Sequence, residues 1–297
     1  MRNHLTILLV CLAAAACSAP VPTGGPASPP PTSGPSSGPS TAPRYAVETG
    51  ADKSILRISD QGGFVPPIYW LTRTPRFVLY GDGRAIVMGP VDSIYPGPLL
   101  PNIRQLHVTP ADIQTILAAA DAAGLLGRDA TYMDADITDA DTTVFATTVD
   151  NVTHVVRVYA LDEATTSQTG DVGAARAKLR DFQSKVLNLP AFLGRSIADA
   201  AYKSTSMRVF TSRQTTDPIS PSPQVVAWPL AADPATAGQA TDTDGIRCML
   251  LTGNDLAAFM TVATTANSTT RWTAPSGRYS VSVRPLYPDE SGCSTPA

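Results

Sequence analysis

The stretch Pro75-Arg76-Phe77-Val78-Leu79-Tyr80-Gly81-Asp82-Gly83-Arg84-Ala85-Ile86-Val87-Met88 decides the fold of this 297-residue chain. Residues 76–80 and 84–88 are rich in β-branched and aromatic side chains. The Asp-Gly pair between the two runs is typical of a tight hairpin turn. The stretch therefore predicts two antiparallel strands, and with them a sheet that is built from hairpins.

Outward from this hairpin, the pattern alternates between strands and helices. Residues 54–59 are a further strand candidate. Thr109-Pro110-Ala111-Asp112 predicts a helix start, because Thr is a good N-cap and Pro suits the first helical position, and Gly124 predicts the end of that helix. A second hairpin at residues 142–160 precedes a helical pattern at residues 175–186. The order ββαββα predicts an α+β fold with helices packed on one sheet face.

A second unit is expected where Leu189-Pro190 interrupts the last of these helices. Thr252-Gly253-Asn254-Asp255 predicts the start of one helix in this unit. The expected strands are residues 207–211, 225–228, 246–251, 271–272 and 279–284. The sequence therefore predicts two α+β domains, residues 44–189 and residues 190–297.

The N-terminus has the pattern of an export signal. A basic start leads into the apolar run 5–16, which ends in Ala14-Ala15-Ala16-Cys17. This run is too short to cross about 30 Å of hydrocarbon. We interpret residues 1–16 as a bacterial lipoprotein signal that is cleaved before Cys17, which then carries the lipid anchor on the extracytoplasmic face of the membrane. The alanines also fit ordinary signal cleavage, which would release a soluble protein.

The residues that follow have the composition of a tether. Residues 17–43 are rich in Pro, Ser and Gly, and this composition cannot bury a core. We therefore expect a solvated, disordered spacer between the lipid anchor at Cys17 and the folded part of the chain.

The cysteine count also indicates export of the protein. Of the four cysteines, Cys11 leaves with the signal and Cys17 takes the lipid. Cys248 and Cys293 then form one natural pair in an oxidising compartment. We predict a disulfide between them, and the alternative is two buried free thiols.

Charge and motif content exclude several function classes. The formal charge is −3, from 22 basic and 25 acidic residues, and no basic run indicates nucleic acid binding. The zinc-protease, Cys-x-x-Cys and phosphate-loop motifs are absent. His154 lies in an alternating strand pattern and His107 precedes a helix, so we interpret both as structural. The sequence indicates no cofactor and no catalytic residue.

Two acidic loops contain the oxygen ligands that calcium prefers. The first contains Asp134, Asp136, Asp139 and Asp141, and it lacks the central Gly and the terminal Glu of an EF-hand loop. The second is Asp242-Thr243-Asp244-Gly245. We interpret the first as a solvated loop that leads into a strand. We assign no metal site, and calcium binding at either loop stays open.

Two segments near the first hairpin are apolar, aromatic and stiffened by proline. They are residues 64–70 and residues 94–101. Rigid aromatic side chains are suitable anchors for a binding partner, and here these would be Phe64, Tyr69, Trp70 and Tyr95. We favour the alternative that both segments cover the open face of the sheet and belong to the core, because large exposed apolar patches are uncommon.

Several segments carry a resemblance to a known family. They are Gly62-Gly63-Phe64-Val65-Pro66-Pro67, residues 75–84, Tyr95-Pro96-Gly97-Pro98, Asp139-Ala140-Asp141-Thr142-Thr143, and the tail from Arg284 to Glu290 with Cys293. Together they resemble an uncharacterised family of secreted actinobacterial lipoproteins. The resemblance implies a cell-surface lipoprotein of a high-GC Gram-positive organism, and it implies no activity.

These observations leave two function classes. The first is a tethered binding or structural module of the cell envelope. Its partners would be the membrane, through the anchor at Cys17, and an envelope protein or a cell-wall component. The alternative is a cell-envelope hydrolase whose catalytic carboxylates or histidine no spacing identifies.

Overall fold

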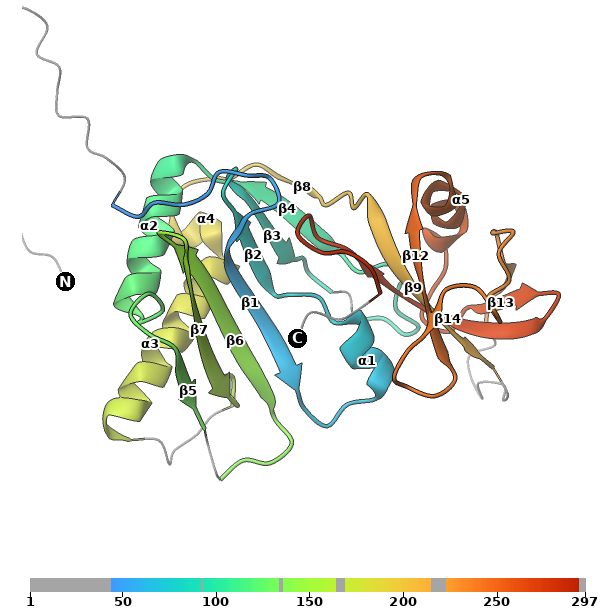
Figure 1. Cartoon of the computed structure of the whole chain (residues 1–297), viewed down its shortest axis with the longest axis horizontal. Helices are drawn as coiled ribbons and strands as arrows, with labels where there is room; N and C mark the ends of the chain where they lie inside the picture. Colours follow the sequence, from blue (N-terminus) through green and yellow to red (C-terminus); the bar gives the residue numbers. More distant parts are fainter. Residues whose placement is uncertain (1–43, 92, 134–135, 164–168, 215–222, 294–297) are drawn as a thin grey trace, which may run out of the picture. The chain divides into compact units, whose positions relative to one another are not determined.

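Two sheets form the framework of the computed structural model, which describes residues 44–297 except 92, 134–135, 164–168, 215–222 and 294–297 (Figure 1). The eight-stranded sheet has the order β5-β7-β6-β1-β2-β3-β4-β8, and the six-stranded sheet has the order β10-β13-β14-β9-β12-β11. The pairs β5–β7 and β10–β13 are parallel, and the other pairs are antiparallel. The predicted α+β class is confirmed.

The elements have the following bounds. The first sheet contains β1 (Ser54–Gly62), β2 (Phe77–Tyr80), β3 (Arg84–Met88), β4 (Ile103–His107), β5 (Ala130–Tyr132), β6 (Asp141–Val149), β7 (Val152–Tyr159) and β8 (Asp199–Ala201). The second contains β9 (Ser206–Arg213), β10 (Val225–Ala227), β11 (Gln239–Ala240), β12 (Ile246–Thr252), β13 (Arg271–Ala274) and β14 (Gly277–Pro285). The helices are α1 (Pro67–Thr72), α2 (Pro110–Ala122), α3 (Gly170–Leu187), α4 (Leu189–Phe192) and α5 (Gly253–Ala263).

The hairpin that the sequence predicts is β2 and β3, in the middle of the first sheet. Its turn requires glycine at Gly83, where φ is 89° and a Cβ would lie 2.4 Å from the carbonyl oxygen of Val108. The predicted helix start is also confirmed. Thr109 and Asp112 form a capping box at the beginning of α2, which satisfies backbone donors that the first helical turn leaves free.

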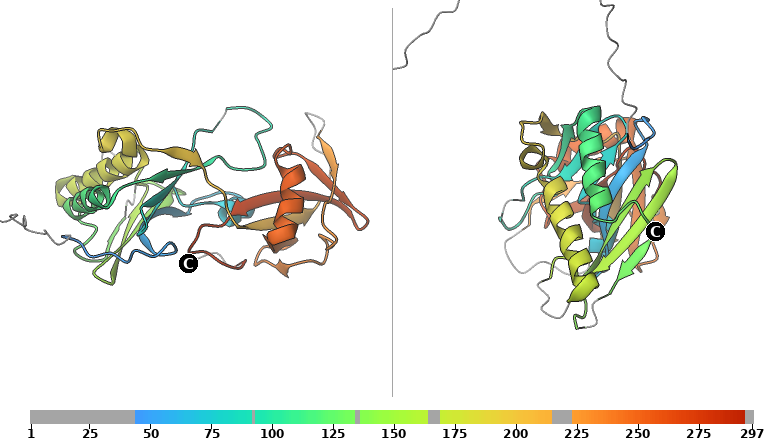
Figure 2. Two further views of the ribbon diagram at one scale, coloured as in Figure 1. Left: turned by 90° about the horizontal axis from the view of Figure 1, so that it is seen from above. Right: turned by 90° about the vertical axis from the view of Figure 1, so that its left-hand side faces the viewer.

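Helices α2 and α3 cover one face of the first sheet, as predicted (Figures 1 and 2). Their buried side chains share a core with alternate residues of the central strands, for example Leu56 and Ile58 of β1. The core residues of the two helices are Ile113, Ile116, Leu117, Ala120, Leu179, Phe182 and Val186. Burial of this apolar surface is the main force that holds helices and sheet together.

The opposite face of the first sheet has a smaller apolar cluster. Val78, Tyr80, Ile86 and Ile103 contribute to it from β2, β3 and β4. Tyr287, which follows β14 near the C-terminus, completes it. The C-terminal segment, residues 286–293, thus covers part of the face that carries no helix.

The second sheet packs against α5 on one face. Leu256 and Phe259 of α5 share a core with Trp272 and with alternate residues of β9, β12 and β14. Phe259 and Trp272 stack at a ring distance of 5.4 Å, and Trp228 packs against both rings. The predicted helix after Thr252 is therefore confirmed.

Some elements differ from the sequence prediction. The sequence did not predict β4, β5, β8, β11 or the short helices α1 and α4. Leu189 of α4 belongs to the core that the first sheet shares with α2 and α3. Strand β8 pairs with β4, so part of the chain after Pro190 joins the first sheet. The division into the domains 44–189 and 190–297 stays a prediction.

The described part of the chain contains no helix with the length and apolarity that a membrane span requires. Residues 1–43, which contain the expected signal, Cys17 and the expected tether, lie outside the described residues.

Candidate functional site

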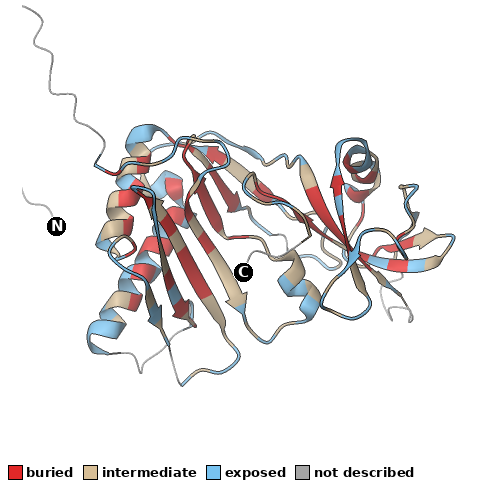
Figure 3. Ribbon diagram, viewed as in Figure 1, coloured by how far each residue is buried: buried red, intermediate tan, exposed pale blue. Residues whose placement is uncertain are grey.

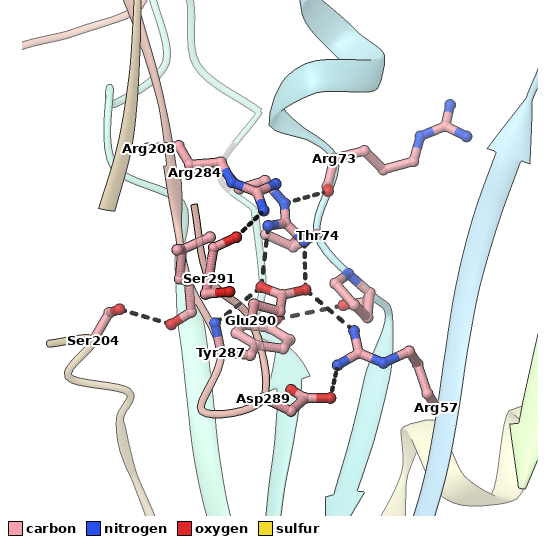
Figure 4. A network of polar contacts seen from close by, with 12 residues as sticks. Arg57, Arg73, Thr74, Ser204, Arg208, Arg284, Tyr287, Asp289, Glu290 and Ser291 are labelled. Atoms are coloured by element: carbon pink, nitrogen blue, oxygen red, sulfur yellow. Dashed lines mark hydrogen bonds and ion pairs between the residues drawn. The ribbon is translucent and has the colours of Figure 1, made fainter. Parts of the chain in front are cut away.

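Glu290 is the centre of a polar network that joins the C-terminal segment to both sheets (Figure 4). One carboxylate oxygen accepts hydrogen bonds from Arg57 of β1 at 3.3 Å and from Arg284 of β14 at 2.7 Å. The other accepts from Arg284 at 3.0 Å and from the Tyr287 amide at 3.0 Å. The Glu290 side chain is only 2% exposed, and these four bonds occupy its acceptor sites. Glu290 is therefore a structural anchor.

Asp289 extends the network on the side of the first sheet. It pairs with Arg57 at 2.5 Å and accepts a hydrogen bond from the Tyr80 hydroxyl at 2.7 Å. Burial acts to lower the pKa of Arg57, but the carboxylates of Asp289 and Glu290 outweigh it and raise that pKa. Burial, and then the bond to Asp289, raise the pKa of Tyr80. Both groups therefore keep their protons and act as fixed donors.

The far end of the C-terminal segment is tied to the second sheet. Cys293 forms the predicted disulfide with the buried Cys248 of β12. Beside it, Arg208 of β9 donates hydrogen bonds to the carbonyl groups of Ser291 and Gly292. The segment is thus held by covalent, ionic and backbone contacts within eight residues.

A pocket of about 340 Å³ adjoins this network. Its lining comes from β1, α1, the residues after α1, β14 and the C-terminal segment. The lining residues are Arg57, Ser59, Asp60, Gln61, Gly62, Trp70, Arg73, Thr74, Pro75, Arg284 and Glu290. The volume lies at the lower end of the range of roughly 300–1,000 Å³ that is typical of small-molecule sites.

The floor of the pocket follows from the alternation of β1. Leu56 and Ile58 point into the core under α2 and α3, so Arg57, Ser59 and Gln61 point to the opposite face. The side chains of Ser59 and Gln61 make no hydrogen bond to any described residue and are half-buried. Their donors and acceptors are available to a ligand.

Trp70 forms one wall of the pocket and is 45% exposed. Its indole nitrogen donates a hydrogen bond to the carbonyl of Gly62 at 3.1 Å, which fixes the orientation of the ring. Next to it, the Arg73 guanidinium lies 5.1 Å from the centre of the Tyr69 ring and pairs with Asp141 at 3.2 Å. Trp70 is thus an oriented aromatic surface at the edge of a polar pocket.

The candidate anchors are exposed, so the prediction that they belong to the core is wrong. Phe64 is 87%, Tyr69 55% and Tyr95 73% exposed, and Figure 3 shows α1 without buried residues. The structure places Trp70 on the pocket and Tyr69 beside it, but Tyr95 is not a lining residue. The chain after Tyr95 packs against the core of the second sheet instead, because Leu99 donates a hydrogen bond to the carbonyl of Ala266 and contacts that core. Partner binding by these anchors stays a prediction.

The two histidines make few contacts. His154 lies 3.7 Å from the carboxylate of Asp129, and His107 is exposed at the end of β4. Neither imidazole makes a hydrogen bond with the described part of the chain. No geometry typical of nucleophile activation is therefore present at either residue.

The acidic loops differ in their surroundings. Asp134 lies outside the described residues, and Asp141 is paired with Arg73. Asp244 lines a cavity of about 310 Å³ together with Arg213 and Arg247, whose positive charges oppose a cation. Among the residues that the structure describes, no group of three or more His, Cys, Asp or Glu side chains is arranged to hold a metal ion.

Sequence reasoning missed the polar network and the pocket floor. The signal was present, because Arg208 and Arg284 interrupt apolar strand patterns, and an arginine there needs a buried partner. A comparison of the chain with protein-family models, curated proteins and solved structures found no match.

Proposed function

We propose that this chain is a lipoprotein of the cell envelope that acts as a tethered binding module, and that the pocket beside Trp70 is its binding site. One observation carries the assignment of the site: Trp70, an oriented and exposed aromatic ring, borders a pocket whose floor offers unused hydrogen-bonding groups at Ser59 and Gln61. Exposed aromatic rings beside polar groups are characteristic of binding sites.

The proposed location rests on three features. The N-terminal pattern that ends in Cys17 is typical of a lipoprotein signal. The disulfide between Cys248 and Cys293 supports export, because disulfides persist in oxidising compartments. The resemblance to secreted actinobacterial lipoproteins agrees with both. Lipidated Cys17 would hold the protein at the extracytoplasmic face of the membrane, within reach of envelope proteins and the cell wall.

The alternative of an envelope hydrolase is supported by one observation, since the carboxylates of Asp60 and Glu290 both line the pocket. Their contacts oppose it. Glu290 has its acceptor sites occupied, and Asp60 accepts hydrogen bonds from Arg76 at 2.5 Å and from Thr143 at 3.2 Å. A general acid or base has to exchange a proton with the substrate. A buried carboxylate whose oxygens already accept hydrogen bonds from arginine is poorly suited to this task. Binding is therefore the stronger proposal.

Photo-crosslinking in living cells tests this proposal. A photoreactive amino acid at Thr74 lines the pocket and leaves the proposed contacts of Ser59, Gln61 and Trp70 in place, and the same residue at Val225 lies on an exposed strand of the second sheet. We expect an adduct with one envelope component from position 74 and none from position 225. Equal adducts at both positions, or no adduct from position 74, would contradict the proposal.

A further inference from the structure

We infer that the pocket beside Trp70 takes a neutral, hydroxyl-rich ligand, namely a short segment of a glycan chain. This inference rests on the proposed function and adds the chemical class of the ligand. Three properties of the pocket carry it: its charge balance, its unused hydrogen-bonding groups and its aromatic wall.

The charge balance opposes an ionic ligand. The arginines of the lining are already paired within the chain, Arg57 and Arg284 with Glu290 and Arg73 with Asp141. The lining carboxylate that remains, Asp60, is paired with Arg76. A phosphate or carboxylate ligand would have to displace one of these internal partners, and leaving a buried charge without its partner costs several kcal/mol. A neutral ligand leaves every pair intact.

The unused groups match hydroxyl chemistry. Ser59 offers a hydroxyl that both donates and accepts, and Gln61 offers an amide that has both functions as well. They are two residues apart on β1 and therefore lie on the same face. A sugar hydroxyl is itself both donor and acceptor, so neighbouring hydroxyl groups of one ring can bond to both side chains. Polar groups that a ligand buries need such partners.

The aromatic wall matches the other side of a sugar ring. A pyranose ring presents C–H groups on one face, while its hydroxyl groups lie around its edge. The exposed ring of Trp70 supplies a flat apolar surface whose orientation the bond to Gly62 has already fixed, so little entropy is lost when a ligand stacks on it. A pocket of about 340 Å³ suits a short segment, and the rest of the glycan chain would lie outside it.

Titration calorimetry with the full mature chain tests this inference. The probes are neutral oligosaccharides of glucose and of N-acetylglucosamine, with an oligosaccharide of glucuronic acid as the acidic counterpart. We expect binding of at least one neutral probe in preference to the acidic one. Trp70→Ala and Gln61→Ala should each weaken it about tenfold or more, whereas Tyr95→Ala, which removes an exposed aromatic residue outside the pocket, should leave it unchanged.

Three results would overturn the inference: no binding of any neutral probe, a preference for the acidic probe, or equal affinity in the Gln61→Ala protein. Gln61 is a half-buried polar residue without a partner in the described chain, so its variant decides the question even if Trp70→Ala fails to fold. Failure of the glycan and failure of the binding site are distinguishable. An adduct between position 74 and a protein, without sugar binding, would contradict the glycan inference and still support the proposed binding module.

Discussion

Arg208 of β9 and Arg284 of β14 lie directly opposite each other in the second sheet, and both are buried. Like charges in such a cross-strand pair destabilise a sheet. Burial, and then the charge of Arg284, lower the pKa of Arg208 to about 10. The C-terminal segment compensates the pair, because Glu290 binds Arg284 with both oxygens and the carbonyls of Ser291 and Gly292 bind Arg208. The second sheet therefore depends on a segment that lies outside it.

The first prediction concerns this compensation. Glu290→Gln should lower the free energy of unfolding by about 3–5 kcal/mol, because it leaves the buried guanidinium of Arg284 without its counter-charge. Urea denaturation of the purified protein measures this loss. The matched control is Glu163→Gln at an exposed position, where we expect a change within about 0.5 kcal/mol. A loss below about 1 kcal/mol for Glu290→Gln would mean that the network does not hold the fold.

The disulfide should contribute to stability through the loop that it closes. Cys248 and Cys293 are 45 residues apart in the sequence, and the chain-entropy relation gives about 4 kcal/mol for a loop of this length. We expect the double variant Cys248→Ala/Cys293→Ala to lose stability on this scale in urea denaturation. Wild-type protein that has been reduced and alkylated should match it. An unchanged denaturation midpoint in both preparations would refute this prediction.

The capping box of α2 should give the protein a defined pH response. Asp112 is partly desolvated, which alone would raise its pKa, but the bonds from Arg195 and Thr109 outweigh this and lower the pKa. A carboxyl group whose pKa is lower in the folded state adds stability above its unfolded pKa of about 3.9. That stability is lost as the pH falls through the folded value.

Asp112→Asn should therefore cost about 1 kcal/mol at pH 7, and the difference from wild type should shrink below about pH 4. Thermal unfolding between pH 2.5 and pH 7 measures it. Asp171→Asn, in the first turn of α3 where no side chain caps the helix, is the control and should show a smaller difference. A difference between Asp112→Asn and wild type that stays constant down to pH 2.5 would count against the proposed role.

Elements with strong local signals could be predicted from the sequence. The turn at Gly81-Asp82-Gly83 and the cap at Thr109 are encoded within a few residues, and both are confirmed. The strand β4 has the sequence Ile103-Arg104-Gln105-Leu106-His107 with two apolar residues, and it forms because β3 and β8 supply partners on both sides. The exposed strand β8 likewise depends on pairing with β4. Such strands have no local signature.

The candidate site was less predictable, because its parts are distant in the sequence. Arg57 and Glu290 are separated by 233 positions, and no spacing rule connects them. The prediction that the aromatic anchors belong to the core was wrong for a related reason. Tyr287 of the C-terminal segment covers part of that face, which leaves Tyr69 and Trp70 of α1 at the surface.

The proposed anchor makes a prediction about location. Cys17→Ala removes the acceptor of the lipid, so the protein should move from the membrane fraction to the medium or remain unprocessed. Fractionation of cells and immunoblotting measure this change, and Cys11→Ala, within the signal, is the matched control that should behave like wild type. Unchanged membrane association of Cys17→Ala would exclude this anchor.

The binding role of the pocket beside Trp70 is tested most directly by crosslinking in a Trp70→Ala background. The photoreactive residue at position 74 is kept, and the adduct and the melting temperature are measured on the same preparations. If the pocket is a binding site, Trp70→Ala should abolish most of the adduct while the protein stays folded, with a melting temperature lower by about 8 °C at most, since the residue is 45% exposed. An adduct of wild-type strength, or an adduct lost only together with a large fall in melting temperature, would contradict this role and make Trp70 a structural residue.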